Sequence, residues 1–318
     1  MSVDCLSAVT VQWICRDGLL DPRGPVGASE ISIMIDASLI MMAIVIPTIV
    51  ATIGFAWWFR ASNTRAGYRP DFTYSGRIEL VVWSIPLMVI LLLGGVSWIG
   101  SHELDPAMPI ESSIAPLEVE VVSLDWKWLF VYPDLGIASV NELVVPAGTP
   151  VHFQLTSASV LSAFFVPQLG SMIYTMNGMT TQLNLLAARP GVFRGMSSHF
   201  NGDGFSGMHF TLSAVPAAQF ADWVAQAHQA GPVLNAASYQ TLSHQSLNVL
   251  PFTFRAVDAG LFSDIVSQTL PPGPGPQSNR GTQADVARVG DCGVECTQRT
   301  ARRIAVFSPT VGADNASR

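Results

Sequence analysis

Two long apolar stretches near the N-terminus dominate the hydrophobic pattern of the chain. Asp36 to Phe59 carries no charge after its first residue, and Ile78 to Ile99 carries only Glu79 near its start. At about 1.5 Å per residue, each stretch as a helix could cross a bilayer core of roughly 30 Å. Buried core helices are the alternative, but apolar runs of this length are typical of membrane spans. The pattern therefore predicts a transmembrane helical hairpin over residues 36–100.

Charged residues around the two stretches predict the orientation of the hairpin. The connection between them contains one acid, Asp71, against four arginines, namely Arg60, Arg65, Arg69 and Arg77. The segment 1–35 contains two arginines, Arg16 and Arg23, against four acids, namely Asp4, Asp17, Asp21 and Glu30. Because positively charged loops stay in the cytoplasm, we expect both termini in the periplasm and the chain in a bacterial inner membrane.

After residue 101 the pattern changes to short alternating runs separated by turn residues. A domain over 101–215 with seven or more short strands predicts a Greek-key sandwich or barrel. The expected strands are Leu117–Ser123, Trp126–Tyr132, Glu142–Gly148, Val151–Ser157, Thr180–Ala187, Val192–Ser198 and Gly207–Val215. A C-terminal helical arm should follow over 216–270, with an amphipathic helix at Ala217–Gln229 and a second helix around Leu261–Thr269.

Composition excludes some classes of function and of site. A net charge of −7 and an acidic pI near 5.3 argue against a nucleic-acid partner. The four cysteines, at 5, 15, 292 and 296, all lie outside the central part of the chain, so they cannot supply a disulfide framework for its core. Residues 271–318 begin with a Pro- and Gly-rich stretch and are expected to be disordered, with Cys292 and Cys296 as incidental thiols of that tail.

Several long motifs resemble one protein family. SLDWKWLFVYP (123–133), FFVPQLG (164–170) and PGVFRGMSSHFNGDGFSGMHF (190–210) resemble subunit II of the haem–copper terminal oxidases. LLDPRG (19–24), GFAWWFRASN (54–63) and SGRIELVVWSIP (75–86) look like the branch of the cytochrome bo-type ubiquinol oxidases. The resemblance covers about residues 15–270. It implies a cupredoxin-like domain in a non-catalytic subunit of an H+-transporting ubiquinol oxidase of an aerobic respiratory chain.

The resemblance also implies where cofactors would lie. Haems, copper and ubiquinol are expected in subunit I, which would pack against this chain in the membrane together with further subunits and lipid. In the copper-bearing relatives, two coppers bind to the outer domain at positions that here hold Ser162, Ser197, His199, Asn201, Phe205 and Met208. Copper in such a centre requires thiolates and imidazoles, so a lone thioether cannot hold it. His199 and His209 are candidate replacement ligands, but surface or packing roles are favoured.

Two further residues are candidates for function. Glu79 stands at the start of the second span, where a first-turn acid could simply complement the helix dipole. An ionisable group in the membrane is also a functional candidate, and the resemblance implies that this one is a proton entrance to subunit I. At Cys15 the resemblance implies lipidation, although the residues before it depart from the small-residue pattern of lipoprotein processing, so lipidation stays open.

The motif around Lys127 raises the question of electron entry. Trp126 and Trp128 are expected to alternate on one strand face. In copper-bearing relatives this aromatic motif assists electron entry from cytochrome c, but without copper a packing role is favoured. Two alternatives remain open, namely a copper-bearing cytochrome c oxidase subunit II and a membrane-tethered β-domain that acts as a binding or assembly factor. Copurification with a haem-bearing, many-span partner would discriminate against the second.

Overall fold

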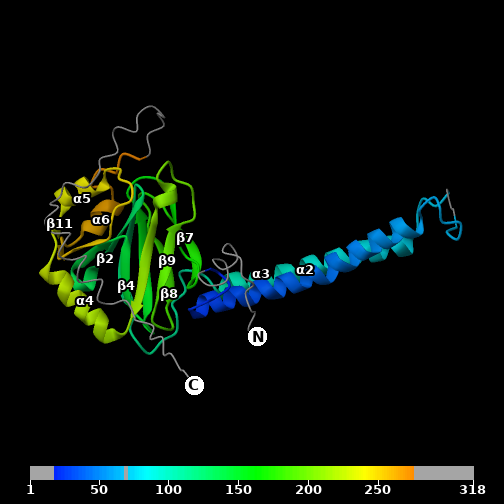
Figure 1. Cartoon of the computed structure of the whole chain (residues 1–318), viewed down its shortest axis with the longest axis horizontal. Coiled ribbons are helices and arrows are strands. Elements are labelled where there is room, and N and C mark those ends of the chain that lie inside the picture. Colours follow the sequence, from blue (N-terminus) through cyan, green and yellow to red (C-terminus); the bar gives the residue numbers. More distant parts are fainter. Residues whose placement is uncertain (1–17, 68–70, 276–318) are drawn as a thin grey trace, which may run out of the picture.

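The computed structural model describes residues 18–67 and 71–275 of the chain. Two long helices, α2 (Pro25–Trp58) and α3 (Gly76–Glu103), extend side by side from a compact β domain (Figure 1). Both are long and apolar enough to cross a membrane, and their apolar side chains are not buried within the chain. The predicted hairpin is confirmed as a pair of helices with the composition of membrane spans.

The first helix begins earlier than the sequence pattern predicts, at Pro25 rather than at Asp36. Its first turns pack on the β domain, where the Gly27 amide donates to the Leu169 carbonyl at 3.1 Å. Proline suits the first turn of a helix because its missing N–H is not needed there. Hydropathy alone did not reveal this start, since the first turns contact protein.

The β domain is a sandwich of two sheets. The six-stranded sheet has the order β12-β3-β2-β1-β5-β8, and the five-stranded sheet has the order β4-β10-β9-β6-β7. β1 pairs in parallel with β5, and β4 pairs in parallel with β10, whereas the other neighbours in these two sheets are antiparallel. The strands are β1 (Leu117–Leu124), β2 (Lys127–Tyr132), β3 (Ile137–Val140), β4 (Glu142–Pro146), β5 (Pro150–Ser157), β6 (Ser162–Val166), β7 (Gly170–Thr175), β8 (Thr181–Leu186), β9 (Gly191–Ser197), β10 (His209–Val215) and β12 (Phe252–Phe254).

Aromatic side chains fill the space between the two sheets. The Phe164 ring lies 5.5 Å from Trp128, 5.4 Å from Phe153 and 5.1 Å from Phe210, measured between ring centroids. Tyr132, which is also fully buried, donates from its hydroxyl to the Val144 carbonyl at 3.0 Å. The predicted Greek-key sandwich is confirmed, and its core is mainly aromatic at the centre.

One part of the predicted strand pattern is wrong. The alternation of Trp126 and Trp128 on one strand does not occur, because Leu124 pairs with Lys127 and the chain turns through Asp125 and Trp126. Trp126 adopts a positive φ of 64°, which places it in the turn and outside β2. Trp128 lies on β2 and is fully buried in the core, and Trp126 reaches the same core from the turn.

The C-terminal arm covers the outer face of the six-stranded sheet. It contains α4 (Ala217–Gln229), β11 (Val233–Leu234), α5 (Ala236–Ser243), β13 (Ala256–Val257) and α6 (Leu261–Val266). Val122, Leu129 and Val140 of the sheet form a second apolar core with arm residues such as Tyr239 and Phe262. The helix at 217–229 is found as predicted, the last helix ends at Val266 rather than Thr269, and α5 was not predicted.

The beginning of the predicted disordered tail is placed against the domain. The Gly273 amide donates to the Ala158 carbonyl at 2.8 Å. Cys292 and Cys296 lie outside the described residues, as does Cys15.

Candidate functional site

Four of the six positions that correspond to copper ligands come together in the β domain. Ser162 begins β6, Ser197 ends β9, and Asn201 and Met208 lie in the loop between β9 and β10. All four are buried. The Asn201 side-chain amide donates to the Ser162 hydroxyl at 2.8 Å and lies 3.0 Å from the Met208 sulfur. We call these four buried residues the Asn201 cluster, in which the Asn201 Oδ1 atom has no hydrogen-bond partner within the part of the chain that the structure describes.

The donor atoms of the Asn201 cluster do not fit copper. Two hydroxyls and one amide are neutral, hard donors, and Met208 supplies the single soft ligand. The Met208 sulfur is already in contact with the Asn201 amide nitrogen, and the Ser197 hydroxyl donates to the His199 carbonyl at 3.1 Å. Over residues 18–67 and 71–275, His, Cys, Asp and Glu side chains form no group of three or more that could hold a metal ion. This chemistry supports no electron-transfer step through the cluster.

His199 and Phe205, the remaining two positions, lie against aromatic rings, and the second histidine, His209, is exposed. The His199 ring is half-buried and lies edge-on to Tyr174, with 5.7 Å between ring centroids. Phe205 packs edge-on against Phe200 at 5.6 Å. His209 is exposed at the start of β10. The packing and surface roles expected for the two histidines agree with these contacts.

We predict that the purified chain retains far less than one copper ion after loading with Cu(II) and removal of excess metal. The reason is that hydroxyl, amide and thioether groups compete poorly with a chelator for copper. Copper should be measured by atomic absorption on a chain whose cysteines at 5, 15, 292 and 296 are replaced by serine, so that these thiols contribute nothing. Stoichiometric copper with the purple colour of a mixed-valence pair would contradict the prediction.

The turn between β1 and β2 with Trp126 and Trp128, which we call the tryptophan hairpin, packs against the loop that carries Asn201 and Met208. Trp126 is 5% exposed and packs against the backbone of Gly204, which has no room for a side chain between Trp126 and Leu247. Trp128 is edge-on to Phe164. Both tryptophans are therefore packed inside the chain, and the arm residue Leu247 helps to cover the tip of the hairpin.

Two polar side chains that the sequence analysis did not single out hold the arm on this hairpin. Lys127 is 1% exposed, and its ammonium group donates to the His244 carbonyl at 2.7 Å and to the Ser246 hydroxyl at 2.6 Å. Burial lowers the pKa of Lys127 to about 8, although the nearby charge of Asp125 acts in the opposite direction. The Asn141 amide donates to the Val249 carbonyl at 2.8 Å. In the sequence, the signal for this role is a lysine at position 127 within an otherwise apolar strand, because a buried ammonium group needs hydrogen-bond acceptors.

The raised pKa of Glu120, on β1 of the six-stranded sheet, predicts that the free energy of unfolding depends on pH. Burial, with Glu118 nearby, raises the pKa of Glu120 from 4.5 to about 7. The folded chain then binds this proton more tightly than the unfolded chain, so stability falls as the pH rises from 4.5 to 7. Glu120→Gln should therefore raise the free energy of unfolding by about 1 kcal/mol at pH 8, with solvent screening taken into account.

The Glu120→Gln prediction is checked by chemical unfolding in detergent at pH 4 and pH 8, followed by near-UV circular dichroism. The stabilisation should disappear at pH 4, where the carboxyl is protonated in both states. Glu111→Gln is the matched control, because Glu111 is exposed in the connection after α3. An equal effect of the two substitutions, or none at pH 8, would contradict the assignment.

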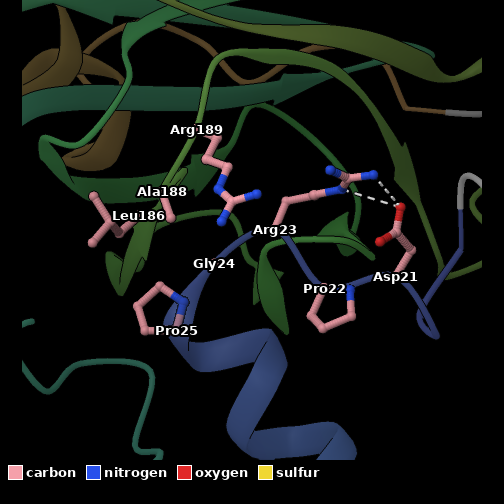
Figure 2. Close-up of a pocket in the computed structure, with 8 residues that line it drawn as sticks. All are labelled: Asp21, Pro22, Arg23, Gly24, Pro25, Leu186, Ala188 and Arg189. Carbon is pink, nitrogen blue, oxygen red and sulfur yellow. Dashed lines mark hydrogen bonds and ion pairs between the residues drawn. The ribbon is translucent and has the colours of Figure 1, made fainter. Parts of the chain in front are cut away.

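A shallow pocket of about 530 Å³ marks the junction of α2 with the β domain (Figure 2). The Arg23 guanidinium pairs with the Asp21 carboxylate at 2.6 Å beside it. The Arg23 amide donates to the Gln168 carbonyl at 2.7 Å, and the Ala188 amide donates to the Arg23 carbonyl at 2.9 Å. We interpret the pocket as the surface of the junction between α2 and the β domain, because the Arg23 guanidinium that borders it is already paired with Asp21.

The candidate proton entrance lies at the other end of the molecule. Glu79 is in the first turn of α3, and its side chain is exposed in the isolated chain. This first turn of α3 adjoins the connection between the two helices, at the end of the helix pair away from the β domain (Figure 1). The proton-entry role stays a prediction.

Comparisons with known proteins agree on one family. Residues 134–215 match the family described as cytochrome c oxidase subunit II, periplasmic domain. The cytochrome bo(3) ubiquinol oxidase subunit 2 of Pseudomonas aeruginosa is 48% identical over 254 residues, which are 80% of this chain and 77% of that protein. The ubiquinol oxidase subunit 2 of Acetobacter aceti is 44% identical over 83% of this chain and 86% of its own length.

A solved structure, the periplasmic domain of subunit II of the cytochrome oxidase of Bradyrhizobium japonicum, is 28% identical and covers 37% of this chain and 96% of its own, with a TM-score of 0.35. The membrane-type helix pair, the cupredoxin-like domain and the subunit 2 relatives together identify a subunit II of a quinol oxidase, which is part of an oxidoreductase complex. The chain belongs to the ubiquinol oxidase subunit 2 family.

Proposed function

We propose that this chain is the redox-inactive subunit II of a proton-translocating ubiquinol oxidase. In this complex, subunit I would bind haems, copper and ubiquinol and would reduce oxygen to water. The observation that carries the proposal is the Asn201 cluster. Its Asn201 side-chain amide donates a hydrogen bond to the Ser162 hydroxyl and contacts the Met208 sulfur, so these two groups already have a partner. A domain with these groups has no centre that could pass electrons from a protein donor to subunit I.

The chain would instead brace subunit I and cover its outer surface. The β domain is joined to both helices, because Gly27 bonds to Leu169 at the start of α2 and Asn184 bonds to Pro106 just after α3. The Glu30 carboxylate also accepts a hydrogen bond from Ser171 on β7. These attachments support a fixed orientation of the domain on the helix pair, in which the side next to α2 would face the membrane and subunit I.

An exposed apolar surface on that side suits a partner protein. Met172 and Tyr174 of β7 are 39% and 41% exposed, and Phe200 in the nearby loop is 70% exposed. β7 is the edge strand next to α2 (Figure 1). Exposed apolar patches rimmed by polar residues are typical of protein interfaces. We propose that this patch contacts the outer loops of subunit I, with the β domain in the periplasm.

Glu79 is proposed to admit protons toward subunit I from the cytoplasmic face. Replacing it with glutamine removes the ionisable group and should slow ubiquinol-driven oxygen uptake about a hundredfold, the low end of the effect of a positioned proton carrier. Glu79→Asp should recover part of the rate, and Glu111→Gln should leave it unchanged. Unaltered turnover of Glu79→Gln in the purified complex would argue against the role.

Copurification tests the whole proposal. A tag on this chain should extract a membrane complex whose reduced-minus-oxidised spectrum shows haem bands and whose other main component is a many-span protein. An extracted chain without haem would favour the alternative of a tethered binding or assembly factor. Haem recovered together with stoichiometric copper on this chain would favour a cytochrome c oxidase subunit instead.

A further inference from the structure

The ends of the two long helices away from the β domain carry a ring of aromatic and cationic side chains. We call this ring the arginine–aromatic collar and define it as Trp57, Trp58, Phe59, Arg60, Arg65, Phe72, Tyr74 and Arg77. Its aromatic members are 47–69% exposed. The collar follows directly on the apolar lengths of α2 and α3 (Figure 1), which is the depth at which aromatic side chains meet the membrane interface.

Local contacts hold Arg60 in place at this depth. Its guanidinium carbon lies 4.9 Å from the centre of the Trp57 ring, a cation–π distance. The same side chain donates to the Trp57 carbonyl at 3.2 Å and to the Ser62 hydroxyl at 2.9 Å. A guanidinium has five N–H donors, so these bonds leave others for an external acceptor. Because the side chain is already ordered, binding a ligand costs less conformational entropy.

The charge of the collar is not compensated within the part of the chain that the structure describes. Arg60, Arg65 and Arg77 are all exposed, and no ion pair joins any of them to a carboxylate among residues 18–67 and 71–275. Asp71 and Glu79 are the acids of this end, and neither is paired with a collar arginine.

The opposite end of the helix pair has the reverse charge. Between residues 18 and 36 and between 101 and 118, Arg23 stands against seven acids, namely Asp21, Glu30, Asp36, Glu103, Asp105, Glu111 and Glu118. An anion at the membrane surface is therefore attracted to one end of the hairpin and repelled from the other.

We infer that the arginine–aromatic collar is a binding surface for the headgroups of anionic phospholipids. At this depth the surrounding ligands are lipids, and a phosphate is the acceptor that guanidinium groups match in geometry. Each arginine near an anionic membrane surface strengthens the attraction of its segment to that surface about fivefold in the binding constant. The aromatic side chains set the depth of the helix ends, and the arginines then select headgroups by charge. This inference is independent of the proposed oxidase function.

The test uses the full chain in nanodiscs of equal phosphatidylglycerol and phosphatidylcholine, with one of the two lipids brominated at a time. Bromine quenches the fluorescence of tryptophans in contact with the lipid. A background with Trp13, Trp83 and Trp98 replaced by phenylalanine leaves Trp57 and Trp58 to report on the collar, and Trp126, Trp128 and Trp223 of the β domain and its arm contribute the same unquenched signal with either lipid. Brominated phosphatidylglycerol should quench about twofold more than brominated phosphatidylcholine.

Matched variants decide whether the arginines cause the preference. Arg60→Gln, Arg65→Gln and Arg77→Gln combined should reduce the excess quenching by at least half, whereas the three lysine variants should retain it. Arg189→Gln with Arg255→Gln, on the β domain, should have no effect. Equal quenching by both lipids, or a preference that persists in the triple glutamine variant, would overturn the inference. Since the lysine variants keep the charge, loss of the preference in them as well would also reject it.

Discussion

Replacing Phe164 with alanine is expected to lower the free energy of unfolding of the β domain by about 4 kcal/mol. The Phe164 ring is fully buried and touches the rings of Trp128, Phe153 and Phe210. Its removal leaves a cavity among rigid aromatic side chains that cannot collapse to fill it. Chemical unfolding of the full chain in detergent, followed by near-UV circular dichroism, measures the loss.

Phe200→Ala is the matched control for this prediction. Phe200 lies on the loop between β9 and β10 and is 70% exposed, so its loss should cost less than about 0.5 kcal/mol. Because both variants replace phenylalanine with alanine, a difference between them reports the effect of burial and not of residue type. If the two variants unfold at similar denaturant concentrations, the aromatic core does not stabilise the domain as described.

The second large effect is expected at Lys127. Lys127→Met removes the donor to His244 and Ser246 and leaves the buried charge of Asp125 without its neighbour. A hydrogen bond from a charged donor is worth about 1.5–3 kcal/mol, so the loss of both bonds should cost about 3–6 kcal/mol. The arm should also loosen, so that amide hydrogen exchange over residues 244–249 increases more than in the strands of the sandwich.

A double variant separates the charge effect from the loss of packing. Lys127→Met with Asp125→Asn also removes the acid beside the deleted ammonium group and should recover part of the lost stability, since a neutral amide is cheaper to bury than a carboxylate. Exchange at residues 244–249 should stay raised, because the anchoring hydrogen bonds are still missing. No recovery in the double variant would show that Asp125 and Lys127 do not depend on one another.

Much of the fold follows from the sequence pattern, and the exceptions have physical reasons. The two apolar helices and the seven expected strands are all present. Their hydrophobic residues recur at the spacing of a membrane helix or of a half-buried strand, and this spacing can be seen in the sequence. β6 and β7 were not predicted as strands, since the turn at 167–169 interrupts a run that lacks clean alternation. Trp126 was assigned to a strand because aromatic residues favour strands, but the two-residue connection between β1 and β2 places it in the left-handed region.

The candidate site was only partly predictable. The positions of Ser162, Ser197, Asn201 and Met208 are those that the family resemblance implies, and their hydroxyl, amide and thioether groups do not fit copper. That Asn201 bridges two of them could not be foreseen, because the hydrogen bond depends on how β6 and the loop after β9 meet in space. The contact of the arm with Lys127 could not be predicted either, because the sequence does not indicate which carbonyl the ammonium group will reach.

Oxygen uptake by the complex purified through a tag on this chain tests the central claim most directly, namely that the outer domain passes no electrons from a protein donor. We predict rapid uptake with ubiquinol as the reductant, and no uptake above the blank with reduced cytochrome c. Sustained oxygen consumption with cytochrome c in a quinol-free preparation would contradict the account.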